Sequence, residues 1–350
     1  MGQSIHLKIY VPLLIFLTCC MTNEEWQEEV SYHNGRKTIT NTEKGIQPGE
    51  NLKLKWRIPE NPDKETTAAG LFGGIVWIEF DPENNLYVLD HLDQSITKLS
   101  PERKVLFRFG SKGQGPGQLR NCTRFVWADG FLFVANRGNN RIEVFDENGK
   151  YHQSIRLDEC KSPSRIYFRS GFFYVSERNF DEKHPIYKYD KSWQLIGKIT
   201  SNEKMVEQLD YLRLRNDTRI AEDGFWVVYL VDNRIQKIDW ESVVLFETSR
   251  KLDWDLPRDP AGRLIPEFPI HRAFDVDPNG DLYIIYSNPK NWRRGNDVYK
   301  YGADGRLHGY MFTLPIENAT MIRFDDDGSF YFADGVSLYK AELIIREPKQ

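Results

Sequence analysis

Hydrophobic and polar residues alternate along most of this chain, in short runs that recur. An alternation with a period of two places successive side chains on opposite faces of a strand, so each run predicts a β-strand. Six copies of one unit follow one another, each with an alternating run, a polar turn and an aromatic-rich run. The copies occupy residues 75–90, 124–136, 165–177, 218–230, 272–286 and 321–334. Each copy predicts a β-hairpin.

The turns inside these units contain the residues that tight hairpins need. Asp-Pro-Asn-Gly at 277–280, Asp-Asp-Gly at 326–328 and Ala-Asp-Gly at 128–130 supply positions that accept a positive φ. A third strand is expected after each hairpin, at 94–100, 140–146, 185–190, 233–239, 297–302 and 336–342. A fourth usually follows after another turn, as at 104–110, 151–157 and 193–199. The unit is therefore a sheet of four strands.

The sixth unit has no clear fourth strand of its own. Residues 52–58 form an alternating run that precedes the first unit and has no partner there. An unpaired edge strand promotes aggregation, and closing a ring of sheets removes the edge. We therefore expect residues 52–58 to complete the sixth sheet. With a spacing of about 40 to 55 residues per unit, the pattern predicts an all-β fold, a six-bladed β-propeller over residues 51–350 with four-stranded antiparallel blades, closed by an N-terminal strand.

Three segments resemble the signatures of the NHL-type six-bladed propeller family. The segment FGSKGQGPGQL at 109–119 is similar to the linker between blades in that family, and NRGNNRIEVFDENGK at 136–150 is similar to its second signature. Residues 231–239 are a weaker copy, and the other blades depart from the pattern. The chain resembles in particular the secreted six-bladed lipoproteins of bacteria. That resemblance implies a fold and a location, but no general activity.

The first twenty residues differ from the rest of the chain. Residues 9–17 are mostly apolar and too short to span a membrane, which is typical of an export signal at 1–20. The sequence LTCC resembles a bacterial lipobox, which makes Cys20 the expected lipid-bearing residue, with Cys19 as the alternative. An ordinary signal peptide with two incidental cysteines is the competing interpretation.

Polar residues dominate the segment that follows the leader. Residues 21–50 are rich in Glu, Asn, Thr, Lys and Gly, and they predict a flexible tether. Met21 follows Cys20 where a retention signal would place Asp, a pattern that resembles lipoproteins sorted to the outer membrane. We therefore expect an exported protein anchored to the cell envelope by lipid.

Composition narrows the classes of partner. The 350 residues are 40% hydrophobic, which is enough for a large core. The formal net charge of −4 provides no basic field for a phosphate backbone, so nucleic acid is not an expected partner. We expect a monomer.

Ligands of a propeller usually meet the mouth of its central channel, near the ends of the inner strands. The candidate residues there are Asp90, His91, Asn136, Arg137, Glu177, Arg178, Tyr229, Tyr286 and Asp334. Their oxygen and imidazole groups can hold Ca²⁺ or Zn²⁺, and similar-looking propeller lactonases and peptide-amidating lyases use channel metals. The sequence lacks three His at corresponding blade positions, however, so no cofactor is expected.

Two other features suggest sites. Trp292 and Arg293 lie in a long loop of the fifth blade and are residue types favoured at binding hot spots, although the Trp can equally pack against the next blade. The insertion 249–270 is expected to be a lid or a buttress. Cys122 and Cys160 precede the inner strands of adjacent blades, so they form either a disulfide or two separate buried thiols.

No catalytic set of residues stands out in the sequence. The leading hypothesis is therefore a non-enzymatic envelope lipoprotein whose propeller binds a peptide, a glycan or a protein. The alternative is a metal-dependent hydrolase or lyase with the metal in the channel.

Overall fold

The fold is seen in a computed structural model that describes residues 28–33, 36–41, 50–59, 71–177, 185–200, 216–230, 233–250, 271–286, 296–316 and 318–345. Within these ranges the secondary structure is almost entirely β-strand, with one short 3-10 helix, η1, at Arg137–Asn139. The strands form six separate sheets. No helix in the described ranges has the length and apolar character needed to cross a membrane.

The first three sheets are consecutive antiparallel units of four strands. Blade 1 contains β4 (Ile75–Phe80), β5 (Leu86–Asp90), β6 (Ser95–Leu99) and β7 (Val105–Phe109). Blade 2 contains β8 (Phe125–Ala128), β9 (Phe131–Asn136), β10 (Arg141–Asp146) and β11 (Tyr151–Ile155). Blade 3 contains β12 (Pro163–Arg169), β13 (Phe172–Glu177), β14 (Ile186–Tyr189) and β15 (Leu195–Ile199).

Two of the remaining three sheets, blades 4 and 6, include strands from the N-terminal part of the chain. Blade 4 contains β16 (Asn216–Ala221), β17 (Gly224–Tyr229), β18 (Ile235–Ile238) and β19 (Val244–Arg250), and two further strands join its outer edge, β2 (Arg36–Asn41) and β1 (Glu28–His33). Blade 5 contains β20 (His271–Val276), β21 (Leu282–Tyr286), β22 (Asp297–Tyr301) and β23 (Leu307–Thr313). Blade 6 contains β24 (Met321–Phe324), β25 (Phe330–Ala333), β26 (Leu338–Ile345) and β3 (Glu50–Ile58).

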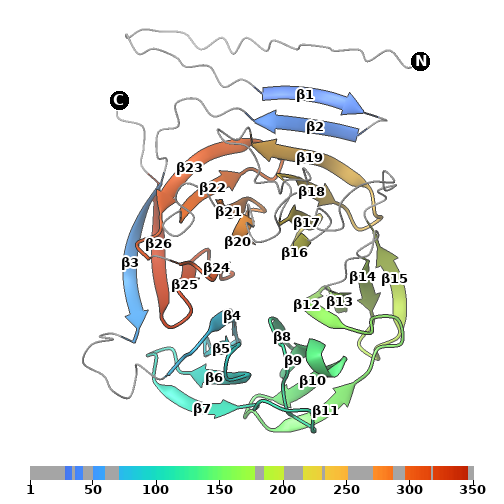
Figure 1. The fold of residues 1–350 in the computed structure, drawn as a ribbon, viewed down its shortest axis with the longest axis vertical. Coiled ribbons are helices and arrows are strands. Elements are labelled where there is room, and N and C mark those ends of the chain that lie inside the picture. Colours follow the sequence, from blue (N-terminus) through green and yellow to red (C-terminus); the bar gives the residue numbers. More distant parts are fainter. Residues whose placement is uncertain are drawn as a thin grey trace, which may run out of the picture.

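The six sheets stand around one axis like the blades of a fan (Figure 1). The first strand of each blade, β4, β8, β12, β16, β20 or β24, lies nearest the axis, and the fourth lies at the rim. The chain is a six-bladed β-propeller, and the predicted fold class is confirmed.

Ring closure also follows the prediction from residues 52–58. Strand β3 pairs antiparallel with β26, with Ile58 opposite Leu338 and Glu50 opposite Ile345. The first propeller strand in the sequence thereby completes the last blade. Ile58 is buried in the cluster that also holds Ile75 and Leu338, so closure adds apolar packing to the backbone hydrogen bonds.

An N-terminal hairpin extends blade 4, which differs from the flexible tether predicted for residues 21–50. Strand β2 pairs in parallel with β19, and β1 covers β2 on its outer side (Figure 1). Asn41 explains why this polar segment orders. Its buried side chain contacts Thr248 and Ser249 of blade 4 and accepts the N–H of Leu307 in blade 5. The tether prediction missed this pairing because the segment has no sustained apolar run.

Aromatic side chains pack the blades against one another. The ring centroids of Tyr87 and Trp127 lie 5.7 Å apart between blades 1 and 2. The corresponding distance is 4.6 Å for Phe133 and Phe173 between blades 2 and 3. Large aromatic surfaces contribute most of the apolar area between sheets, and tilted pairs add about 0.5–1.5 kcal/mol each. The aromatic-rich runs of the sequence are therefore the interfaces between blades.

The short turns also match the sequence. Asp277 is typical, since its Oδ1 accepts the N–H groups of Asn279 and Asp281 at 2.9 and 3.0 Å. The three turn glycines predicted to need a positive φ have one, with values of +85° at Gly130, +86° at Gly280 and +79° at Gly328. Each closes a hairpin between an inner strand and its neighbour.

Candidate functional site

The two faces of the ring differ in the connections they carry. In a four-stranded antiparallel blade, the turns after the first and third strands lie at one end, which we call the turn face. The connections after the second strand and between blades lie at the other end, which we call the loop face.

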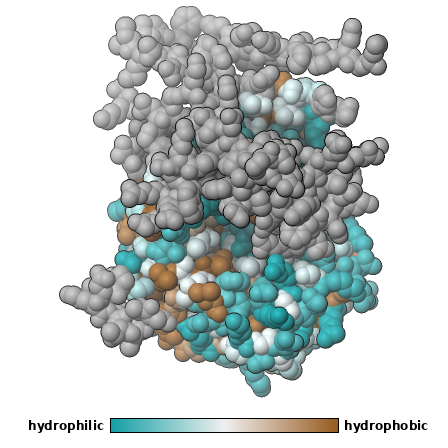
Figure 2. All heavy atoms as spheres, viewed as in Figure 1, coloured by the Kyte–Doolittle hydropathy of each residue, from teal (hydrophilic) through white to brown (hydrophobic). Residues whose placement is uncertain are grey.

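Figure 2 shows a group of hydrophobic atoms over blade 1. Leu92 and Val336, in loop-face connections of blades 1 and 6, are 63% and 52% exposed.

Asp90 and His91, predicted at the channel mouth, lie at the loop-face end of β5. Asp90 is fully buried, and its carboxylate accepts N–H groups from Gly73, Leu92 and Asp93 at 2.5, 2.9 and 3.1 Å. A carboxylate with three backbone donors stabilises the turn and has little capacity left for a ligand. The His91 ring is partly exposed, with Nδ1 at 3.3 Å from the Cys122 carbonyl.

Asn136 and Arg137, the second predicted pair, lie where the Gly-rich segment crosses blade 2. Asn136 is fully buried, accepts the N–H of Arg120 at 2.9 Å and donates to the Gln118 carbonyl at 2.8 Å. Asn136 therefore fixes the 110–119 linker to blade 2. Arg137 is partly exposed at the start of η1. In blade 3, Glu177 accepts the N–H of Ser162 at 2.9 Å.

The other predicted ligand residues are buried, engaged in a turn or outside the described residues. Tyr229 and Tyr286 are almost completely buried, and their hydroxyls contact Gln236 and the Tyr301 hydroxyl. Asp334 accepts the N–H groups of Val336 and Ser337 in its turn. Residues Arg178, Trp292 and Arg293 lie outside the described ranges, as do Cys19, Cys20 and positions 251–270 of the predicted insertion.

Cys122 and Cys160 are free, buried thiols, which corrects the disulfide alternative. They fail to pair because each packs in a different apolar cluster, Cys122 with blades 1, 2 and 6 and Cys160 with blades 2 and 3. Burial raises the pKa of the Cys122 thiol to about 12. Burial also raises the pKa of Cys160, with a further contribution from the charge of Glu177.

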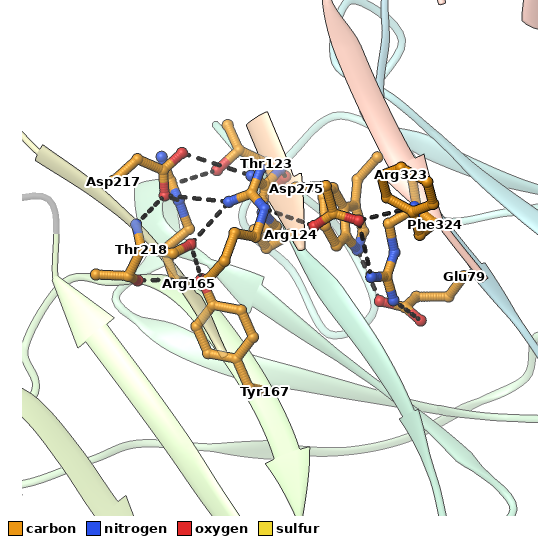
Figure 3. Close-up of polar contacts among 12 residues, drawn as sticks. Glu79, Thr123, Arg124, Arg165, Tyr167, Asp217, Thr218, Asp275, Arg323 and Phe324 are labelled. Carbon is orange, nitrogen blue, oxygen red and sulfur yellow. Dashed lines mark hydrogen bonds and ion pairs between the residues drawn. The ribbon is translucent and has the colours of Figure 1, made fainter. Parts of the chain in front are cut away.

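A cluster of charged side chains lies on the axis among the described residues, and sequence reasoning missed it. Figure 3 shows side chains from the inner strands pointing toward one another across the channel. All six blades contribute. We call the following set the axial cluster: Trp77, Glu79, Thr123, Arg124, Arg165, Asp217, Arg219, Asp275 and Arg323.

Asp217 of β16 is the centre of one half of the axial cluster. Its carboxylate lies 2.5 Å from Arg165, 3.5 Å from Arg124 and 3.6 Å from Arg219. Burial alone would raise the pKa of Asp217, but the three guanidinium groups outweigh it and hold the pKa well below its usual range. This carboxylate stays ionised and joins blades 2, 3 and 4.

Asp275 of β20 is the centre of the other half. It accepts hydrogen bonds from Arg219 Nε at 3.0 Å and from the backbone N–H of Phe324 at 2.8 Å. Arg323 bridges Asp275 at 3.3 Å and Glu79 at 3.4 Å. Burial lowers the pKa of Arg323, but Glu79 and Asp275 outweigh this and raise it. The chain of ion pairs thus continues through blades 4, 5, 6 and 1.

Trp77 gives the axial cluster an aromatic wall. The guanidinium carbons of Arg124, Arg323 and Arg219 lie 3.7, 4.9 and 5.0 Å from its ring centroid. Three cations around one indole are attracted by the negative face of the ring, which partly compensates for their loss of water. The indole N–H donates to Glu79 and to the Phe125 carbonyl, which fixes the orientation of the ring.

The donor set of the axial cluster suits anions better than metal ions. Each carboxylate in it already pairs with at least one guanidinium group, and a divalent cation there would lie close to several positive charges. No group of three His, Cys, Asp or Glu side chains arranged to hold a metal ion occurs among the described residues. The positive charge of this part of the channel therefore disfavours the Ca²⁺ or Zn²⁺ that the alternative hypothesis requires.

A repeated arginine was the signal for the axial cluster. Five of the six hairpin units carry an arginine in or directly before the inner strand: Arg124, Arg165, Arg219, Arg272 and Arg323.

Comparisons with known proteins agree with the fold. No family model matches the chain. The chain is 24% identical over 253 residues to Lactonase drp35 of Staphylococcus aureus, covering 67% of this chain and 71% of that protein. A Bacteroides fragilis structure described as an exported protein aligns with a TM-score of 0.58 and 12% identity, over 89% of this chain and 100% of that one. Virginiamycin B lyase of Staphylococcus aureus aligns with a TM-score of 0.51 and 14% identity, over 93% and 97%.

Proposed function

We propose that this protein is an exported, lipid-anchored binding protein of the bacterial cell envelope. It recognises a peptide, a glycan or a protein partner on its loop face and is not an enzyme. The observation that carries this proposal is the state of the axial carboxylates, because Glu79, Asp217 and Asp275 are all engaged by arginine. A rigid ring with loops on one face is suited to recognition, since the blades fix the geometry that the loops use.

Two further observations support the proposal. The exposed Leu92 and Val336 give the loop face an apolar contact area. The backbone hydrogen bond from the Ile75 N–H to the Gly335 carbonyl joins the inner strand of blade 1 to the connection that holds Val336. The fold is also similar to that of the Bacteroides fragilis protein described as exported.

The lipid anchor, and with it the location at the cell envelope, can be tested at the two cysteines of the export signal. Metabolic labelling with a palmitate analogue should mark the wild-type protein and the Cys19→Ala variant, and the label should be lost in Cys20→Ala. Labelling that persists in Cys20→Ala but disappears in Cys19→Ala would move the anchor by one residue. The absence of label in the wild type would remove the lipoprotein from the proposal.

Partner binding can be tested by site-specific photo-crosslinking in intact cells. A crosslinking residue at Leu92 on the loop face should give a discrete adduct. The matched control is Asn148, exposed in a turn-face connection of blade 2, where none is expected. An adduct that forms equally from both positions would contradict recognition by the loop face.

The alternative function is a metal-dependent hydrolase or lyase. The similarity to Lactonase drp35 over 253 residues favours it. The alternative predicts stoichiometric Ca²⁺ or Zn²⁺ in protein purified without chelators, lactone hydrolysis above background, and loss of both in Asp90→Ala or Asn136→Ala. Purified protein without metal or activity would leave binding as the function.

A further inference from the structure

The axial cluster contains more positive than negative charge. Four arginines, Arg124, Arg165, Arg219 and Arg323, face three carboxylates across the channel. Asp275 and Glu79 compensate for Arg323 and for part of Arg219. Asp217 is the one carboxylate of the cluster left to compensate for Arg124, for Arg165 and for the remaining charge of Arg219. The uncompensated charge is therefore in the half around Asp217.

Arg124 is the least compensated of these cations. Its side chain is 8% exposed, and its nearest carboxylate oxygen is 3.5 Å away on Asp217, which has a closer partner in Arg165. Its Nε has no hydrogen-bond partner among the described residues and is shielded from water. Burial lowers the pKa of Arg124 well below its usual range, and the neighbouring charge of Arg219 lowers it further. A buried guanidinium group with so little negative charge close to it favours the binding of an anion.

Arg165 is the more accessible arginine in the half of the axial cluster around Asp217. Its side chain is 13% exposed, and its Nε and Nη1 are used by Asp217, Thr123 and Ser164. Its Nη2 makes no hydrogen bond to the described residues. The Thr123 hydroxyl lies 3.1 Å from Nη1, next to the same guanidinium group. The N–H groups of Nη2 can donate to the oxygens of a carboxylate. The Thr123 hydroxyl donates to the Ser164 carbonyl at 3.3 Å and accepts from Arg165, so it holds the guanidinium group in position for that ligand.

We propose that the channel binds a carboxylate group at Arg165, with the buried charge of Arg124 behind it. The carboxylate supplies the missing negative charge on the axis. Its source is a free peptide C-terminus or an acidic sugar. The site does not depend on partner binding at the loop face, so the two proposals can fail separately.

The test is the thermal stability of the mature protein in sodium acetate against sodium chloride at equal ionic strength. A ligand that binds only the folded state stabilises it by RT ln(1 + [L]/Kd), so the melting temperature rises with the logarithm of the ligand concentration once that concentration exceeds Kd. We expect a logarithmic increase in acetate that chloride does not give, with an acetate Kd, fitted from that increase, at least tenfold weaker in Arg165→Lys. Lysine keeps the charge beside Asp217 but loses the fork. The matched control Arg306→Lys, at an exposed arginine on the turn face, should behave as the wild type.

A second comparison identifies the source of the carboxylate. A short peptide with a free C-terminus is compared with its amide, and glucuronate with glucose. We expect the charged member of at least one pair to bind to the wild type and to bind at least tenfold more weakly to Arg165→Lys. Equal effects of acetate and chloride, or equal acetate affinity in wild type and Arg165→Lys, would overturn the proposal. If Arg165→Lys does not fold, Thr123→Val serves as the second variant, with a weaker acetate affinity expected and an unchanged one contradicting the site.

Discussion

Asn41 donates a hydrogen bond from Nδ2 to the hydroxyl of Thr248 at 2.9 Å, across 207 positions of sequence. The Thr248 hydroxyl in turn donates to the Gly305 carbonyl of blade 5 at 2.7 Å. Two side chains thus connect the N-terminal hairpin, blade 4 and blade 5. The hairpin acts as a strap across the junction between these blades.

The strap makes Asn41 important for stability. In Asn41→Ala, the Leu307 N–H and the Thr248 hydroxyl lose buried partners, so we expect the free energy of unfolding to fall by about 2–3 kcal/mol. Urea denaturation measures the change. Thr40→Ala, on the same strand and partly exposed, should cost under about 0.5 kcal/mol. Equal losses in the two variants would contradict the role of Asn41.

Closure of the ring should depend on Ile58. Its side chain is buried between the first and last blades, so Ile58→Ala should lower the free energy of unfolding by about 2–4 kcal/mol. Leu54 lies on the same strand but is 48% exposed, and Leu54→Ala should have a much smaller effect. Chemical denaturation of both variants provides the comparison, and a larger effect at Leu54 would count against this packing.

The axial cluster should respond differently to the loss of an anion and the loss of a cation. Asp217→Asn leaves three guanidinium groups around a neutral side chain, and we expect a loss of about 3–5 kcal/mol. Arg124→Gln removes the excess charge and should cost clearly less. Denaturation at neutral pH shows which of the two variants loses more stability. A larger loss of stability in Arg124→Gln would show that the charge excess is wrongly assigned.

His271 should make the protein sensitive to acid. It is buried, its Nδ1 contacts the Tyr229 carbonyl at 2.6 Å, and burial lowers its pKa from 6.5 to about 4. The folded state therefore holds the neutral ring while the unfolded state binds a proton below pH 6.5. Stability from this group is complete above pH 6.5 and is lost as the pH falls toward about 4.

The size of this effect follows from linkage. The gap between 6.5 and about 4 corresponds to about 3 kcal/mol of stability. Denaturation between pH 7 and pH 4 should show a smaller pH dependence in His271→Asn, which keeps a donor for Tyr229. His152→Asn, at an exposed histidine, should retain the wild-type dependence. Identical profiles in all three proteins would exclude His271 as the sensitive group.

The two buried thiols predict a clear chemical result. In a truncated protein that starts at residue 21 and so lacks Cys19 and Cys20, a thiol reagent should react very slowly with Cys122 and Cys160 in the native state. After denaturation it should react rapidly with both. A reductant should not change the melting temperature, because no disulfide is broken. A drop in melting temperature with reductant would mean that the cysteines can pair.

Local patterns in the sequence were enough to predict the blades. Alternation, turn glycines and the unpartnered run at 52–58 are properties of neighbouring residues, and strand pairing depends directly on them. The hairpin of β1 and β2 was missed because its order depends on Asn41, which finds its partners in two distant blades.

The candidate site was harder to predict because its residues meet only when all six blades are in place. Asp90 and Asn136 looked available in the sequence, yet each is used inside its own blade or linker. Arg124 and Asp217 are 93 positions apart. The repeated arginine marks the inner strands, but it does not indicate which carboxylate each arginine meets on the axis.

Because β3 precedes the first blade and β26 belongs to the last, the two ends of the propeller lie in one sheet. During synthesis or export, Glu50–Ile58 stays unpaired until nearly the whole polypeptide has emerged and its partner strand β26 is available. A product truncated before Leu338 would keep an open edge and an incomplete blade, and such a species is prone to aggregation and proteolysis. Only a chain that includes β26 can therefore close the ring.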